Sequence, residues 1–105
     1  MTPEGKVKGA FKRVAKKYRL LVLSLWMFHV TGVPDTIVLL NGARVVWIEF
    51  KKDRKTGLRP TQGPTIRLLR RLGFRVEVVK DTETAVALAT ELGVEYERWR
   101  RCQEF

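Results

Sequence analysis

The sequence predicts a single domain of the α/β (α+β) class, in which a mixed sheet is flanked by helices. Two short apolar runs, 37–40 and 45–48, are joined through Asn41-Gly42, a strong signal for a β-hairpin. Segments with helical spacing of apolar residues precede this hairpin and follow it. A chain of 105 residues has room for one domain with a modest core, so we assign residues 1–105 to one unit.

The first helix begins near the amino terminus. Thr2 is a capping residue, Pro3 suits the first helical position, and Glu4 adds an acid to the first turn. An apolar stripe at helical spacing follows: Val7, Phe11, Val14, Tyr18 and Leu21. Position 4 extends this stripe, so Glu4 either complements the helix dipole or faces an interior site.

Three strands are expected next, over 23–30, 35–40 and 43–51, and the helix that follows separates them from a fourth strand over 74–79. Thr61 caps that helix and Gly73 ends it, with Ile66, Leu69 and Leu72 facing the core. A crossover helix between two strands favours a mixed sheet.

A third helix starts at Asp81 or Thr82, and Gly93 is expected to close it. Its expected core residues are Val86, Ala89 and Leu92. A short last helix is expected over 95–101.

Charged residues sit at the end of the predicted hairpin. Because side chains alternate along a strand, Glu49 and Lys51 project from one face, opposite to Phe50. A loop of Asn41 and Gly42 alone would set Asp35 opposite Ile48, on the wrong face. We therefore expect Pro34, which has no N–H, to introduce a kink or bulge that turns Asp35 towards Glu49.

The net charge predicts a polyanionic partner. The sequence has 21 Lys and Arg against 11 acids, a formal charge of +10. Nucleic acid fits this charge best, and an anionic membrane is second. The longest apolar stretch, 20–33, is shorter than the roughly 20 residues that span a bilayer. With no signal peptide and Cys102 as the only cysteine, we expect an intracellular, cytoplasmic protein without disulfides or a zinc site.

The basic residues that we expect to contact DNA come from the first helix, the loop after Lys51 and the second helix. They are Lys8, Lys12, Lys16, Arg54, Lys55, Arg67, Arg70 and Arg71. For each cluster the alternative is an ordinary solvated face. Such contacts carry no base code, so recognition by backbone or shape is expected.

Five short motifs recur in the order of a known family. They are Thr2-Pro3-Glu4-Gly5, Gly32-Val33-Pro34-Asp35, Glu49-Phe50-Lys51, Thr61-Gln62 and Gly73-Phe74-x-Val76. Over roughly residues 2–79 the chain resembles the virus-type replication-repair nuclease (VRR-NUC) family, in its stand-alone, phage-like form, within the PD-(D/E)xK nuclease superfamily. The segment 27–31 is shorter than the loop of many members. The resemblance implies a restriction-endonuclease-like core.

The resemblance also implies a site. Asp35, Glu49 and the backbone carbonyl of Phe50 would bind Mg²⁺ or Mn²⁺, with Glu4 as an accessory acid, and Lys51 and Gln62 would act beside them. Hard cations take such oxygen ligands and acidify a bound water. Without the resemblance, Gln62 is an ordinary first-turn residue. The implied activity is endonucleolytic cleavage of branched DNA such as Holliday junctions, by a homodimer.

Two alternatives stay open on the sequence alone. The chain is either a basic DNA-binding protein that does not cut, with Asp35, Glu49 and Lys51 as a structural cluster, or a nuclease subunit that needs a replication or repair partner. His29 is more typical of a packing residue than of a ligand. The tryptophans, Trp26, Trp47 and Trp99, are assigned to the core or to a subunit contact.

Overall fold

The computed structural model describes residues 3–25, 32–53, 55, 57–58 and 62–103. Its elements follow in the order α1 (Pro3–Lys17), β1 (Leu21–Ser24), β2 (Thr36–Leu40), β3 (Arg44–Phe50), α2 (Gln62–Arg71), β4 (Arg75–Val79) and α3 (Thr82–Cys102). The predicted sequence of a helix, three strands, a helix, a strand and a final helical segment is confirmed.

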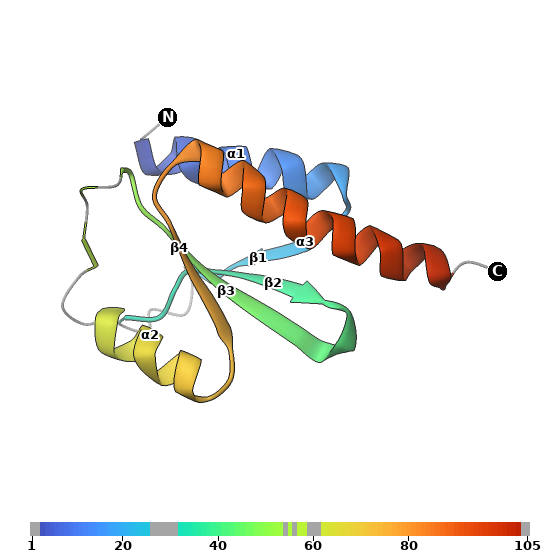
Figure 1. The fold of residues 1–105 in the computed structure, drawn as a ribbon. Coiled ribbons are helices and arrows are strands. Elements are labelled where there is room, and N and C mark those ends of the chain that lie inside the picture. Colours follow the sequence, from blue (N-terminus) through green and yellow to red (C-terminus); the bar gives the residue numbers. More distant parts are fainter. Residues whose placement is uncertain (1–2, 26–31, 54, 56, 59–61, 104–105) are drawn as a thin grey trace.

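The strands form one mixed sheet in the order β1-β2-β3-β4. β1, β2 and β3 are antiparallel neighbours. β4 runs parallel to β3, because α2 carries the chain back to the end of the sheet at which β3 begins. In Figure 1, α1 and α3 lie together on one side of the sheet and α2 lies on the other. The sheet is therefore covered on both sides, as the crossover predicts.

The main core lies between the sheet and the α1–α3 layer. Phe11 of α1 and Leu92 of α3 are fully buried there against Ile48 and Phe50 of β3. The Phe11 and Phe50 rings lie 5.5 Å apart, tilted by 60°. Since each buried aromatic or aliphatic side chain contributes about 1.5–3 kcal/mol, this contact fixes α1 over the carboxyl end of β3.

A left-handed residue ends α1. Arg19 has a φ of 60°, and the Leu20 N–H donates to the Ala15 carbonyl at 3.0 Å, which is the geometry of a Schellman-type helix end. The chain turns there, so Leu21 leaves the helical stripe and enters β1, where it is exposed. Its assignment to the α1 core was wrong, whereas Val7 and Phe11 are buried as expected.

The turn between β2 and β3 differs from the expected two-residue loop. It is a three-residue 3₁₀ turn, η2 (Asn41–Ala43), in which Gly42 has a φ of 74°. Ala43 also has a positive φ, of 58°. Leu40 consequently pairs with Arg44 instead of Ala43, and every later pair of the hairpin shifts by one residue.

One continuous helix replaces the two that the sequence predicts at the carboxyl end. α3 runs for 21 residues through Gly93, which is buried in its interior. A Cβ at this position would collide with the Cγ and Cδ2 of Tyr18, and would lie 2.8 Å from its Cβ. Gly93 therefore serves the close approach of α1 and α3 and does not end a helix. The predicted cap is confirmed, since Asp81 accepts a hydrogen bond from the Thr84 N–H at 2.7 Å.

Several smaller expectations differ or lie outside the described residues. Leu72 is 64% exposed and Val86 is 40% exposed, so neither belongs to the core. β1 starts earlier than predicted and ends at Ser24. Leu25 is described but lies outside β1, and residues 26–30 of the expected strand, with Trp26 and His29, and the cap at Thr61 lie outside the described residues. In the part of the chain that is described, no helix combines the length and apolarity that crossing a bilayer requires.

Candidate functional site

The hairpin register brings the two acids of the predicted site together. Thr36 pairs with Ile48, so one further step sets Asp35 opposite Glu49. The three-residue turn thus supplies the alignment that we had expected from a bulge at Pro34. The nearby Asp35 carboxylate contributes to raising the pKa of Glu49, as two like charges on neighbouring strands should.

Glu49, Lys51 and Gln62 form a buried polar cluster. Their exposed fractions are 5%, 6% and 1%. Lys51 Nζ lies 3.4 Å from Glu49 Oε2 and donates a hydrogen bond of 2.8 Å to Gln62 Oε1. Glu49 of β3 and Lys51, the residue that follows β3, thereby lie on one face, while Ile48 and Phe50 of β3 enter the core on the other. The predicted face assignment is confirmed.

Burial sets the protonation behaviour of Glu49. Removal from water raises the pKa of this carboxyl above its ordinary value, and the charge of Asp35 raises it further. Lys51 and the amide of Gln62 oppose this shift. Because the effect of burial is the largest of these, the ionised form of Glu49 is less stable in the fold than it would be in water.

Asp35 stands at the start of β2 with two partners. Its Oδ1 accepts a hydrogen bond from the Thr36 hydroxyl at 3.0 Å, and its Oδ2 lies 3.7 Å from Lys8 Nζ. The Asp35 side chain is 39% exposed and that of Lys8 is 22% exposed. Lys8 was expected on the outer, DNA-facing side of α1, whereas it reaches the site. A sequence signal existed, because Lys8 precedes the buried Phe11 by one helical turn.

The oxygen donors suit a hard divalent cation. Asp35 and Glu49 offer carboxylates. The strand pairing ends at Thr36 and Ile48, and continuing it by two residues would set Phe50 opposite Pro34, which has no N–H to give to the Phe50 carbonyl. Two carboxylates and a carbonyl match the ligands that Mg²⁺ and Mn²⁺ prefer. The described residues hold no group of three Asp, Glu, His or Cys side chains that would bind a metal. Glu4 belongs to α1, but its side chain lies outside the described part.

The basic residues expected to contact DNA lie on α1, after β3 and on α2. Lys12, Lys16 and Lys55 are exposed, while Arg54 lies outside the described residues. On α2, the side chains of Arg67, Arg70 and Arg71 line a hollow of about 380 Å³ with Pro64. One of these arginines is partly committed to the fold, because Arg70 Nη2 donates to the Val76 carbonyl at 2.7 Å.

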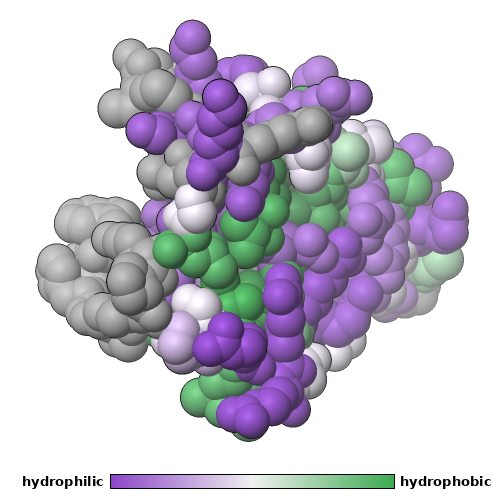
Figure 2. Space-filling view, turned by 60° about the vertical axis from the view of Figure 1, so that its left-hand side comes forward, coloured by the Kyte–Doolittle hydropathy of each residue, from purple (hydrophilic) through white to green (hydrophobic). Residues whose placement is uncertain are grey.

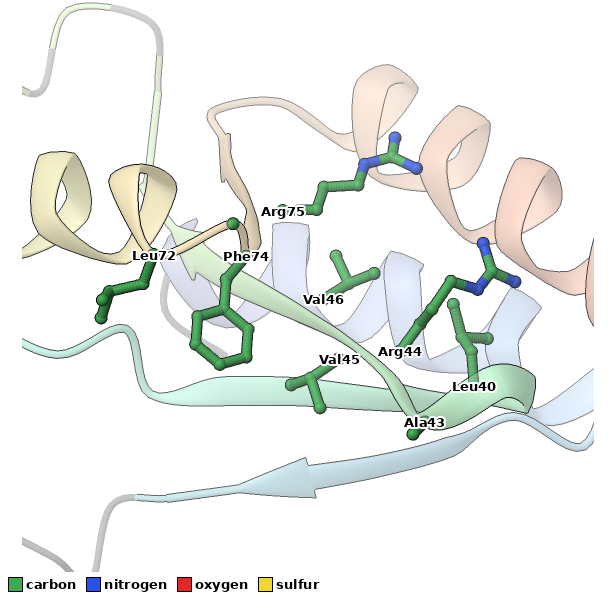
Figure 3. Close-up of a pocket in the computed structure, with 9 residues that line it drawn as sticks. Leu40, Ala43, Arg44, Val45, Val46, Leu72, Phe74 and Arg75 are labelled. Atoms are coloured by element: carbon green, nitrogen blue, oxygen red, sulfur yellow. The ribbon is translucent and has the colours of Figure 1, made fainter.

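A second hollow, of about 360 Å³, lies beside the β2–β3 turn, at the end of the sheet opposite to Glu49 and Lys51. Figure 3 shows Leu72, Phe74 and Val45 on one side of it, while Arg44 and Arg75 extend towards α3. These arginines pair with acids of α3, since Arg44 Nη2 lies 2.8 Å from Glu95 Oε1 and Arg75 binds both oxygens of Glu91. The described residues that line this hollow are mainly apolar, apart from these two arginines.

Comparison with known proteins supports the assignment that the motifs suggested. Neither the protein-family models nor the curated proteins give a match to the sequence. Among solved structures, a chain described as "VRR_NUC domain" is similar to this one, with a TM-score of 0.75 and 30% sequence identity. The likeness covers 84% of this chain and 95% of that chain. The predicted fold class, a four-stranded mixed sheet with helices on both sides in a PD-(D/E)xK-like arrangement, is confirmed, and the chain belongs to the VRR-NUC family.

Proposed function

We propose that this protein is a divalent-metal-dependent endonuclease that hydrolyses phosphodiester bonds of DNA, and that it selects branched structures such as Holliday junctions. The observation that carries the proposal is the cluster of Glu49, Lys51 and Gln62, buried on one face of the sheet with Asp35 in register beside it. Even a paired set of buried charges adds little net stability, because removing both charges from water costs about as much as their attraction returns. A cluster of this composition is accordingly maintained for chemistry more readily than for stability.

The proposed metal ligands follow from the oxygen donors of the site. Asp35, Glu49 and the Phe50 carbonyl would hold Mg²⁺ or Mn²⁺, and Glu4 is the accessory acid. When bound, such an ion acts as a Lewis acid on the phosphate and makes a bound water a stronger acid. The role of the ligand residues is to fix that ion at the end of β3.

Lys51 and Gln62 act on the substrate side of this arrangement. The Lys51 ammonium would neutralise charge that develops on the phosphoryl oxygens or orient the attacking water. Gln62 holds that ammonium through its side-chain oxygen. Because Gln62 begins α2, the positive end of the helix dipole lies at this residue and would favour an anion nearby.

The basic surface would hold the rest of the DNA. Figure 2 turns the left-hand side of Figure 1 forward and shows hydrophilic side chains around a central apolar area. We assign Lys12, Lys16 and Lys55, with the arginines that line the α2 hollow, to phosphate contacts. These contacts are independent of base sequence, which supports selection by DNA structure.

A homodimer would bring two sites to the two strands of a junction. Leu21 and Leu23 of the edge strand β1 are 53% and 37% exposed, and apolar side chains at a sheet edge favour association.

We propose a cytoplasmic location, in a bacterial host if the gene is carried by a phage.

The second candidate function is DNA binding without cleavage, either alone or as a subunit that needs a replication or repair protein. The formal charge of +10 favours it as much as it favours a nuclease. Under this alternative, the Glu49–Lys51 pair is a structural ion pair. Replacing it would then change stability but no activity.

The test is cleavage of a labelled four-way junction, a flap and a plain duplex, in Mg²⁺ or Mn²⁺ and in EDTA. Asp35→Asn and Glu49→Gln should abolish cleavage and keep or strengthen DNA binding, because each removes a negative charge. Glu83→Gln is the matched control, since this acid is exposed on α3. Paired nicks across the junction that require metal support the proposal. Tight binding without cleavage in any metal supports the second candidate.

A further inference from the structure

Each of the two described carboxylates of the site is matched with its own lysine. Glu49 is paired with Lys51, at 3.4 Å between charged atoms, and Asp35 is paired with Lys8, at 3.7 Å. Lys51 follows directly after β3, the strand that carries Glu49, whereas Lys8 comes from α1. The Lys8–Asp35 pair therefore joins two parts of the chain that are distant in sequence. Lys8 is not among the residues of the family motif.

The environment of Lys8 distinguishes it from the other lysines of α1. Its side chain is 22% exposed, while Lys6, Lys12, Lys16 and Lys17 are exposed. Its neighbours on the helix surface include Phe11, which is buried in the core against Phe50. The helix is thus fixed in a rotation that directs Lys8 to Asp35 at the start of β2, and its ammonium does not simply extend into solvent.

The position of the ammonium conflicts with a cation on the same carboxylate. Asp35 Oδ1 already accepts a hydrogen bond from Thr36, and Oδ2 faces Lys8. A divalent cation at Asp35 would meet a like charge within a few ångströms, and two like charges this close repel. Lys8 and the cation therefore oppose each other at this carboxylate.

We propose that Lys8 competes with the divalent cation for Asp35 and, once displaced, binds a phosphate oxygen of the DNA backbone. This inference rests on the proposed function. Before a metal binds, Lys8 balances the negative charge of Asp35. The four-carbon stem allows the ammonium to move while α1 stays in place.

The test compares Mn²⁺ binding by calorimetry, in the absence of DNA, between the wild type and Lys8→Met. Methionine keeps the unbranched apolar stem, so the fold should persist. We expect Lys8→Met to bind Mn²⁺ about two- to fivefold more tightly, which is the size of a partly exposed ion pair. Lys8→Arg should bind as the wild type does, and so should Lys6→Met, an exposed lysine on the same helix.

The second measurement is single-turnover cleavage of the four-way junction at saturating Mn²⁺. Lys8→Met should cleave at least roughly tenfold more slowly than the wild type, as expected when an electrostatic contact to a phosphate is lost, while Lys8→Arg should retain most of the rate. Lys8→Met that binds Mn²⁺ no more tightly than the wild type would overturn the competition. Unchanged cleavage by Lys8→Met would overturn the phosphate contact. A wild type that binds Mn²⁺ but cuts no DNA would refute the proposed nuclease, and the Mn²⁺ comparison would still decide the competition.

Discussion

Glu49 is the residue at which stability and function oppose each other. Burial raises the pKa of its carboxyl above the ordinary value of 4.5. An acid with a raised pKa in the folded state contributes most stability below its unfolded pKa, and this contribution is lost as pH rises through the folded pKa. The ionised form that a metal requires is therefore the form that the metal-free fold tolerates less well.

The consequence is measurable in Glu49→Gln, which cannot ionise. The difference in unfolding free energy between variant and wild type should move in favour of the variant as pH rises from about 4 to about 8. Chemical denaturation without metal at several pH values measures this difference. Glu83→Gln, at an exposed position, should show no such trend. A constant difference for Glu49→Gln across the range would show that burial does not control this carboxyl.

At the level of elements, the contact between α1 and α3 depends on Gly93. Gly93→Ala should lower the unfolding free energy by about 1–3 kcal/mol, because the new methyl group overpacks against the Tyr18 side chain. The gain in helix propensity of about 1 kcal/mol offsets only part of the cost of the close contact with Tyr18. Urea denaturation measures the net change.

Gly63 of α2 is the matched control for that substitution. A Cβ there would meet Arg67 Nη1 at 3.4 Å, an ordinary contact. Gly63→Ala should therefore be neutral or stabilising. Equal effects of the two substitutions would contradict the close approach of α1 and α3.

The end of α1 offers a prediction of the opposite sign. Arg19 adopts a φ of 60°, a conformation that costs an ordinary residue roughly 1–2 kcal/mol and glycine much less. Arg19→Gly should raise the unfolding free energy by about 0.5–1 kcal/mol, after the greater flexibility of glycine in the unfolded chain is deducted. Thermal unfolding measures the change. A lower Tm for Arg19→Gly would show that the arginine side chain makes a contribution that the backbone geometry does not reveal.

At the scale of the whole molecule, the excess of basic residues should control DNA affinity through salt. The logarithm of the binding constant for a junction should fall linearly with the logarithm of the salt concentration. Lys12→Ala or Lys16→Ala should each reduce the magnitude of this slope by about 1. Arg101→Ala is the control, because Arg101 pairs with Glu97 near the carboxyl end of α3, which points away from the amino-terminal end of α1 (Figure 1). Fluorescence anisotropy over a salt series measures the slopes. If the substitutions at Lys12 and Arg101 changed the slope equally, the α1 face would not be the DNA-binding surface.

The sequence predicted the order of elements and the cluster of Glu49 and Lys51, because apolar alternation along β3 determines which side chains share a face. It did not predict the register. That depends on Ala43 adopting a positive φ, which the residue type does not indicate. The role of Gly93 was missed for a related reason, since a glycine within helical periodicity is ambiguous until its neighbour Tyr18 is known. The spacing of Lys8 from Phe11 hinted that this lysine lies near the core, but its pairing with Asp35 required tertiary information.

The most direct test of the central claim compares Lys51→Met with Lys52→Met in single-turnover cleavage of a four-way junction at saturating Mn²⁺. The two lysines are neighbours in sequence, but Lys51 is buried between Glu49 and Gln62 whereas Lys52 is exposed. If the buried cluster is the hydrolytic site, Lys51→Met should lower the rate by about 10²–10³-fold, and Lys52→Met should cleave at close to the wild-type rate. Similar rates for the two variants, with both folded by circular dichroism, would contradict the assignment of the site.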